Sequence, residues 1–142
     1  MPKMIFVNLP VADIKRATAF YEALGVQKNP KFSSDDTSCM VYSDTIYSML
    51  MTRERFATFT HRQIVDAHTS IQTGLCLTAD SRAEVDETLD KATKAGGVPD
   101  PDPAQDHGFM YGRSFADPDG HIWESVWMDP DAAANGPPET AS

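Results

Sequence analysis

The sequence predicts an α+β fold of two βαβββ modules, whose strands form a cupped, mixed β-sheet cleft. A strand, a capped helix and a Gly–Val exit occur twice, from Asp13 to Gly25 and Val26 and from Asp80 to Gly97 and Val98. A pair of strand-like runs follows each copy. The 142 residues, 41% hydrophobic and 23% charged, are an ordinary globular mixture of the size of one domain. The side chains of the two copies match poorly, so the repeat is one of structural pattern.

The first module is predicted over about residues 3–60. Residues 3–9 are mostly β-forming and end at Pro10, which cannot donate to a β-ladder, so they indicate a strand. Asp13 suits a helix N-cap, and apolar residues then recur at helical spacing as far as Gly25, a typical C-cap. The rest is predicted as a strand at about 26–32, a hairpin from 39–42 and 46–51, and one helical turn within 53–60.

The second module is predicted over about residues 72–128, after a linker at 61–71. Its elements are a strand at 73–79, a cap at Asp80–Ser81, a helix ending at Gly96–Gly97, a loop at 98–107, and strands at 109–116 and 121–128. The sequence Asp117-Pro118-Asp119-Gly120 is typical of the turn that joins two such strands. We therefore expect a single domain over 1–128 and a flexible tail at 129–142, which lacks periodicity and bulk.

Charge and composition exclude several classes of partner. The formal net charge of −9 repels nucleic-acid phosphates and anionic lipids, so we expect neither nucleic acid nor membrane as a partner. The N-terminal residues lack the apolar run of a signal peptide, and no run is long enough to span a membrane. Cys39 and Cys76 are expected to be free thiols, and the chain is expected to be cytoplasmic.

Two sets of residues resemble a known family. Val11-Ala12-Asp13 precedes Phe20-Tyr21 and Leu24-Gly25, and Asp117-Pro118-Asp119-Gly120 precedes Glu124. Together these motifs resemble the vicinal-oxygen-chelate superfamily of glyoxalases, bleomycin resistance proteins and extradiol dioxygenases, over about residues 3–128. The resemblance implies a glyoxalase-like fold, a homodimer as a common assembly, and in many members a divalent metal held by four side chains from four strands.

The family's metal ligands are largely missing when they are carried over one at a time. The first position falls on Phe6, the second at about Met49 and the third on Gly74 or Thr73. Only the fourth, Glu124, retains a ligand. A single carboxylate does not make the family's metal site, so no cofactor is predicted, although a divalent metal stays possible.

Glu124 is the leading candidate for a functional side chain. Strand alternation places Ile122, Glu124 and Val126 on one face, and Trp123 and Trp127 on the other, under a helix. A carboxylate between two apolar side chains is costly to bury unless it is paired, which favours a role as base or metal ligand. The alternative is a structural pair with Arg113 or Tyr111.

Other residues are expected around the same cleft. Asn8 and Cys76 hold matched inward positions, Asn8 as a hydrogen-bonding group or as a turn partner of Pro10, and Cys76 as a thiol in the cleft or in the core. His107 could lie at the cleft mouth as a base. His121 is three residues from Glu124 on a strand and therefore on the opposite face, so the two do not chelate together. His61 and His68 are interpreted as solvated linker residues.

The aromatic and thioether side chains predict a soft, apolar cleft. We expect Met40 in the core and Tyr111 in the cleft, with Arg113 as a weak candidate for binding a carboxylate or phosphate. The apolar set is Phe6, Met40, Tyr47, Met49, Met51, Met110 and Tyr111.

These observations leave three hypotheses open. The first is a protein that binds a small organic molecule without the standard metal site, through Phe6, Asn8, Met49, Cys76, Tyr111 and Arg113. The second is a lyase, an isomerase or a dioxygenase-like enzyme that uses Glu124, assisted by His107 or Tyr111. The third is an interaction module with a vestigial cleft. The ligand itself has no signature in the sequence.

Overall fold

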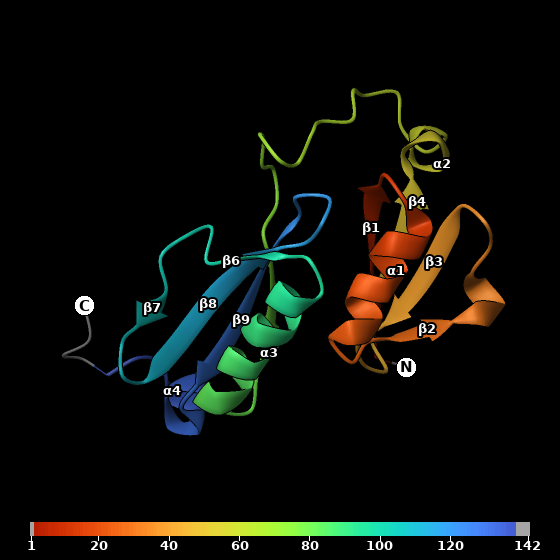
Figure 1. Ribbon diagram of the computed structural model, residues 1–142. Helices are drawn as coiled ribbons and strands as arrows, with labels where there is room; N and C mark the ends of the chain where they lie inside the picture. Colours follow the sequence, from red (N-terminus) through yellow and green to blue (C-terminus); the bar gives the residue numbers. More distant parts are fainter. Residues whose placement is uncertain (1, 139–142) are drawn as a thin grey trace. The chain divides into compact units, whose positions relative to one another are not determined.

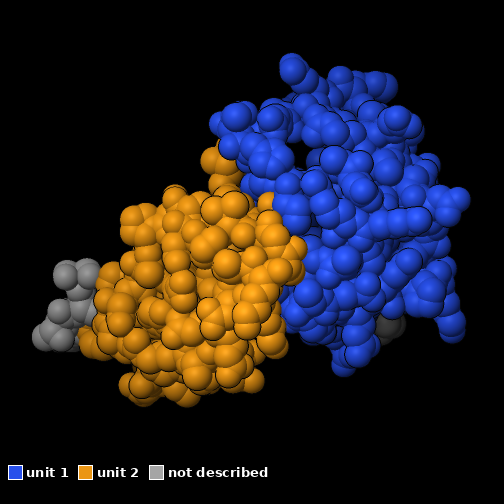
Figure 2. Space-filling view, viewed as in Figure 1, with its two compact units in different colours: residues 1–70, 118–121 blue, residues 71–117, 122–142 orange. Residues whose placement is uncertain are grey.

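The computed structural model describes residues 2–138, in nine strands and four α-helices. The chain divides into two compact units (Figure 2). The first unit comprises residues 1–70 and 118–121, and the second comprises residues 71–117 and those from 122 onward. Almost all of the predicted linker and most of the Asp-Pro-Asp-Gly turn therefore belong to the first unit.

The sheet of the first unit has the strand order β1-β4-β3-β2. Strand β1 (Ile5–Val11) runs parallel to β4 (Ile46–Thr52), and β3 (Thr37–Val41) runs antiparallel to β4 and to β2 (Gln27–Asn29). We predicted that the first strand ends before Pro10, which was wrong, because β1 continues to Val11. An edge strand tolerates proline because one side of it has no ladder partner that needs its N–H.

Helix α1 (Ile14–Ala23) covers one face of this sheet (Figure 1). The predicted cap is confirmed, since the Asp13 carboxylate accepts hydrogen bonds from the backbone N–H of Lys15 and Arg16 at 2.9 and 3.1 Å. Phe20 and Tyr21 are buried at 1% exposure each. The Thr18 hydroxyl donates to Ser38 of β3 at 2.9 Å, so Ser38 and the residues in alternation with it face the helix.

The remaining elements of the first unit are short. The predicted strand at 26–32 is divided into β2 and a 3₁₀ turn, η1 (Pro30–Phe32), where Asn29 caps and Pro30 begins the turn. Helix α2 (Arg53–Ala57) is the predicted helical turn after β4. Residues 58–74 contain no helix or strand, as expected for the linker.

The second unit repeats this topology with the order β5-β9-β8-β6. Strand β5 (Leu75–Thr78) runs parallel to β9 (Ile122–Met128), and β8 (Met110–Ala116) runs antiparallel to β9. The predicted loop at 98–107 contains two very short strands that pair with β8, namely β6 (Val98–Pro99) and β7 (Gln105–Asp106).

Helix α3 (Arg82–Lys94) packs on β8 and β9. Of the two predicted cap residues, Ser81 is the N-cap, and its hydroxyl accepts a hydrogen bond from the Glu84 N–H at 3.1 Å. Val85, Leu89 and Ala92 of the helix are buried, and so is Trp123 of β9. The prediction that the tryptophans of β9 lie under a helix is confirmed for Trp123.

The C-terminal segment differs from the predicted flexible tail. Pro130–Asn135 form helix α4, because Asp129 accepts from the Asp131 N–H at 2.8 Å, Pro130 stands at the first helical position, and Ala132 is buried. Residues 139–142 lie outside the described residues. Among residues 2–138, no helix is long and apolar enough to cross a membrane.

Candidate functional site

In the first unit α1 packs against β3 and β4 on one face of the sheet, and the opposite face is its open face. Register places Asn8, Met49 and Cys39 in one row of this open face, across β1, β4 and β3. The next row holds Phe6, Tyr47 and Val41. Because side chains alternate along a strand, the buried Leu9, Ser48 and Leu50 point to the helix-covered face instead.

The open face of the first unit is aromatic and partly accessible. The Phe6 and Tyr47 rings are stacked, with centroids 4.7 Å apart and planes 10° apart. Phe6 is 50% exposed, whereas Cys39 on the same face is 1% exposed. Burial raises the pKa of the Cys39 thiol. Phe6, Asn8 and Met49 therefore lie on one face as predicted, and exposed Phe6 gives that face an accessible aromatic ring.

The corresponding row of the second unit carries ionisable groups. Cys76 of β5, Glu124 of β9 and Ser114 of β8 lie side by side. Cys76 precedes the N-cap Ser81 by the same five positions by which Asn8 precedes the N-cap Asp13. The two residues are thus structurally matched, as predicted. Cys76 is exposed, so its alternative placement in the core is wrong.

Glu124 lines a small pocket of about 70 Å³ in the second unit. Among residues 2–138, no side chain or backbone group forms a hydrogen bond or ion pair with its carboxylate. Burial and, after it, the negative charge of Glu124 raise the pKa of the Cys76 thiol. The other lining residues are Asp102, Pro103, Gln105, Met110, Gly112, Arg113, Ser114 and Val126.

Several of these lining residues were missed in the sequence. Ser114 is the register partner of Glu124, and Gln105 is that of Gly112. The first pairing could have been found by counting outward from the Asp117–Gly120 turn. The second depends on β7, whose two residues carry no strand signal of their own.

Two predicted members of the cleft, Tyr111 and Arg113, have their polar groups bonded to aspartates, although Arg113 also lines the pocket of Glu124. Tyr111 lies on the helix-covered face, where its hydroxyl donates to Asp86 of α3 at 2.6 Å. Arg113 donates to Asp86 at 3.0 Å and to Asp100 at 2.7 and 3.1 Å. Their side chains point away from the face of Glu124, because Tyr111 pairs with Trp127 and Arg113 with Ser125. The structure therefore supports neither Tyr111 as an assistant of Glu124 nor a Glu124 pair with Arg113 or Tyr111.

This network shifts the pKa values of its members. The hydrogen bond from Tyr111 and then that from Arg113 lower the pKa of Asp86, and the same Tyr111–Asp86 bond raises the pKa of the tyrosine. Arg113 likewise holds the pKa of Asp100 below its usual value. Paired groups of this kind stabilise the packing of α3 on its sheet and leave little capacity for a ligand.

His107 lies beside the pocket of Glu124. Its N–H donates to the Met110 carbonyl at 2.9 Å, and its Nε2 lies 3.5 Å from the Gln105 amide oxygen, a long contact. The ring stacks against Phe109 with centroids 6.0 Å apart. The proposed role of His107 as a base stays a prediction.

The donor set does not fit the family's metal centre. Among residues 2–138, no group of three or more His, Cys, Asp and Glu side chains is arranged to hold a metal ion. In the rows that face away from the helices, the first unit offers Asn8, Met49 and the buried thiol of Cys39, and the second offers Cys76, Glu124 and Ser114. Divalent metals in oxygen and nitrogen sites need more carboxylate or imidazole ligands than these.

The comparison with family models decides the affiliation. The model for the Glyoxalase/Bleomycin resistance protein/Dioxygenase superfamily matches residues 3–125. This chain belongs to that superfamily. The predicted glyoxalase-like α+β fold is thereby confirmed. No curated protein matches the chain in sequence.

Solved structures of the glyoxalase superfamily and related folds match nearly the whole chain. A hypothetical protein, SA1046 from S. aureus, has a TM-score of 0.76 at 23% identity, covering 89% of this chain and 95% of that one. A glyoxalase/bleomycin resistance protein/dioxygenase family enzyme from Burkholderia phytofirmans PsJN has a TM-score of 0.73 at 19% identity, with coverages of 89% and 99%. The fosfomycin resistance protein FosX from Listeria monocytogenes has a TM-score of 0.64 at 17% identity, with coverages of 89% and 91%. At these identities the likeness establishes the fold alone.

Proposed function

We propose that this glyoxalase-superfamily chain binds a small organic molecule that combines an apolar body with a cationic or hydrogen-bond-donating group. The observation that carries the proposal is the Glu124 carboxylate, which lines a pocket beside Met110 and Val126 without a partner among residues 2–138. A carboxylate accepts hydrogen bonds only, so its complement is a donor, and an ammonium group forms the stronger, charge-assisted bond.

The size of the pocket limits what enters it. A volume of about 70 Å³ accommodates an ammonium or hydroxyl group and the carbon next to it, and not a whole drug-sized molecule. The apolar body would then lie on the open face of the sheet, against Met110 and Val126.

A titration with two matched probes tests the proposal. We expect 2-naphthylmethylamine to bind at least about tenfold more tightly than the neutral 2-naphthalenemethanol at pH 7, as measured by calorimetry. Glu124→Gln should abolish this difference. Glu87→Gln, which removes an exposed carboxylate of α3 that does not line the pocket, is the matched control and should preserve it. Equal affinity of both probes for the unmodified chain, or a preference that survives Glu124→Gln, would overturn the proposal.

The second candidate is an enzyme, a lyase, an isomerase or a dioxygenase-like protein, with Glu124 as base or metal ligand. It is favoured by the same unpaired carboxylate, which lies next to a thiol, and by the enzymes among the chain's structural relatives. The metal content of the protein after exposure to nickel, zinc, manganese and iron separates the two candidates. About one ion per chain, lost in Glu124→Ala, would favour the enzyme over the binding protein.

A further inference from the structure

Besides the pocket of Glu124 in the second unit, the first unit contains a cavity of about 340 Å³. This volume is large enough for a small organic molecule. It lies between the end of β1, the start of α2, the linker and residues 119–121, and all of its lining residues belong to the first unit. Its apolar walls are Pro10, Ala12, Val65 and Ala67. Its polar lining residues are Arg53, Asp66, His68, Asp119 and His121.

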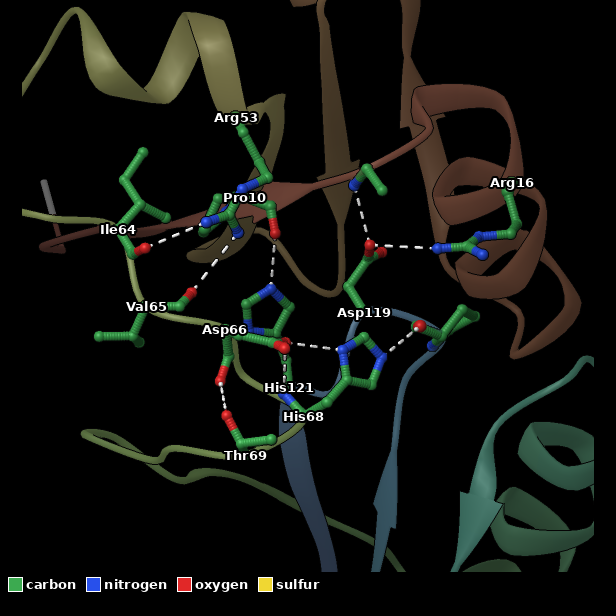
Figure 3. Close-up of polar contacts among 12 residues, drawn as sticks. Pro10, Arg16, Arg53, Ile64, Val65, Asp66, His68, Thr69, Asp119 and His121 are labelled. Atoms are coloured by element: carbon green, nitrogen blue, oxygen red, sulfur yellow. Dashed lines mark hydrogen bonds and ion pairs between the residues drawn. The ribbon is translucent and has the colours of Figure 1, made fainter.

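Arg53 is held in place by backbone groups and not by a carboxylate. Its guanidinium donates to the Ile64 carbonyl at 3.0 Å and to the Val65 carbonyl at 3.4 Å (Figure 3). Among residues 2–138, the guanidinium takes part in no ion pair. Because a guanidinium carries five N–H groups, about three of them remain available to a ligand. The side chain is thus a cation at the cavity whose orientation is fixed by two backbone carbonyls.

His68 lies between two hydrogen-bond acceptors at the cavity. Its Nδ1 lies 2.8 Å from the Asp66 carboxylate, and its Nε2 lies 3.1 Å from the Pro118 carbonyl (Figure 3). Both partners are acceptors, so the ring satisfies both bonds only as an imidazolium, with a proton on each nitrogen. The bond with Asp66 and then the bond with Pro118 raise the pKa of His68 accordingly.

The two carboxylates of the cavity are already engaged. Asp66 accepts from the backbone N–H and the ring of His68. Asp119 accepts from the Ala12 N–H at 2.8 Å and from Arg16 at 3.2 Å. The imidazole of His121 donates from Nε2 to the Pro10 carbonyl at 2.8 Å. Both carboxylates are therefore bonded to other groups of the first unit, while the Arg53 guanidinium is bonded to backbone carbonyls.

We propose that this cavity is a binding site for a small organic carboxylate, anchored by the guanidinium of Arg53, with its apolar body against Pro10, Val65 and Ala67. A planar guanidinium whose orientation is fixed in advance matches a carboxylate, and fewer donors must be ordered on binding. The site lies in a different unit from Glu124 and selects a ligand group of the opposite charge.

The test uses 2-naphthoate as the probe and neutral 2-naphthalenemethanol as its matched control. We expect naphthoate to bind more tightly than the alcohol at pH 7, and to shift the ring signals of His68 and His121 in NMR spectra of the whole chain. Arg53→Gln should weaken naphthoate binding at least about tenfold. Arg62→Gln, which removes a linker arginine that does not line the cavity, should leave the affinity unchanged.

Two further results guard against a false answer. Arg53→Lys retains the charge but not the planar guanidinium, so it should bind naphthoate with intermediate affinity. It controls for any effect on folding, because both variants lose the guanidinium. Naphthoate affinity that is equal in Arg53→Gln and the unmodified chain, or binding that leaves both histidine signals in place, would overturn the proposal. Because the naphthylmethylamine titration reports on the second unit and the naphthoate titration on the first, failure of either proposal is seen separately.

Discussion

The two units share a topology and differ in the chemistry that they place on it. In each, an N-terminal strand runs parallel to the last strand of the hairpin, and one helix covers one face of the sheet. Below α1 the polar contacts are neutral and buried, as between Thr18 and Ser38. Below α3 they are ion pairs at the surface, as between Arg113 and its two aspartates. The same backbone pattern is therefore compatible with two different ways of attaching a helix.

The open faces differ in the same manner. The row of Asn8, Met49 and Cys39 is uncharged, whereas the matched row of Cys76, Glu124 and Ser114 contains a carboxylate and an exposed thiol. Topology fixes which positions face away from the helix, since strand alternation and register decide this. The side chains at those positions are free to vary, and a functional asymmetry between the units follows from that freedom.

The turns of the two hairpins provide the largest expected effect. The turn of the first hairpin, Ser43–Thr45, is exposed or half-buried. The turn of the second hairpin is closely packed, because a Cβ atom on Gly120 would lie 2.6 Å from backbone atoms of Ala67 and His68. Gly120→Ala should therefore lower the free energy of unfolding by about 3 kcal/mol, from the clash and from the positive φ together. Urea denaturation measures the change.

Gly25→Ala is the matched control for that substitution. Gly25 has φ of 93° against 92° for Gly120, but nothing lies within 4 Å of its added Cβ. Gly25→Ala should therefore lower the free energy of unfolding only through the positive φ, by about 1–2 kcal/mol. Equal losses in the two variants would show that the linker does not hold the turn.

The contrast below the helices predicts a smaller effect that depends on pH. Asp86→Asn should destabilise the chain by about 0.5–1 kcal/mol at pH 7, since it removes a charge paired with Arg113 at the surface. The folded pKa of Asp86 is lowered, so this contribution is present above the unfolded pKa and is lost as the pH falls through the folded value. Urea denaturation of both proteins between pH 7 and pH 2 measures it.

Ser38→Ala supplies the opposite case in the first unit. This substitution should lower the free energy of unfolding by about 1–2 kcal/mol, because it removes a buried neutral hydrogen bond. The loss should not change over the same pH range or in 1 M salt. A pH-dependent loss in Ser38→Ala, or a pH-independent one in Asp86→Asn, would contradict the distinction between the two faces.

The smallest expected effect concerns the two thiols of the open faces. Exposed Cys76 should react with iodoacetamide and Cys39, at 1% exposure, should not while the chain is folded. Glu124→Gln should accelerate the reaction of Cys76 at pH 8 by about two- to fourfold, because the carboxylate raises the pKa of that thiol. Peptide mass spectrometry locates and times the modification. An unchanged rate would mean that Glu124 and Cys76 do not interact.

Local signals in the sequence determined much of this protein. Asp13 and Ser81 cap their helices because short polar side chains satisfy the first free N–H groups, and the Asp117–Gly120 turn sets the pairing of β8 with β9. Alternation from that turn correctly placed Glu124 opposite the tryptophans. The same alternation places the side chains of Tyr111 and Arg113 on the helix-covered face, because both are an odd number of residues from Ser114, the partner of Glu124, although Arg113 still lines the pocket of Glu124.

Only the tertiary structure decided the partners of residues that lie far apart in the sequence. The cavity around Arg53 and His68 combines the end of a strand, a linker without periodicity and a turn about 50 positions further on, and no local pattern links these segments. His68 is exposed, as expected of a solvated linker residue, but its ring also contacts the Pro118 carbonyl, which no local pattern could indicate. Helix caps and alternation arise from neighbouring residues, whereas the charge state of a side chain depends on every group that folding brings near it.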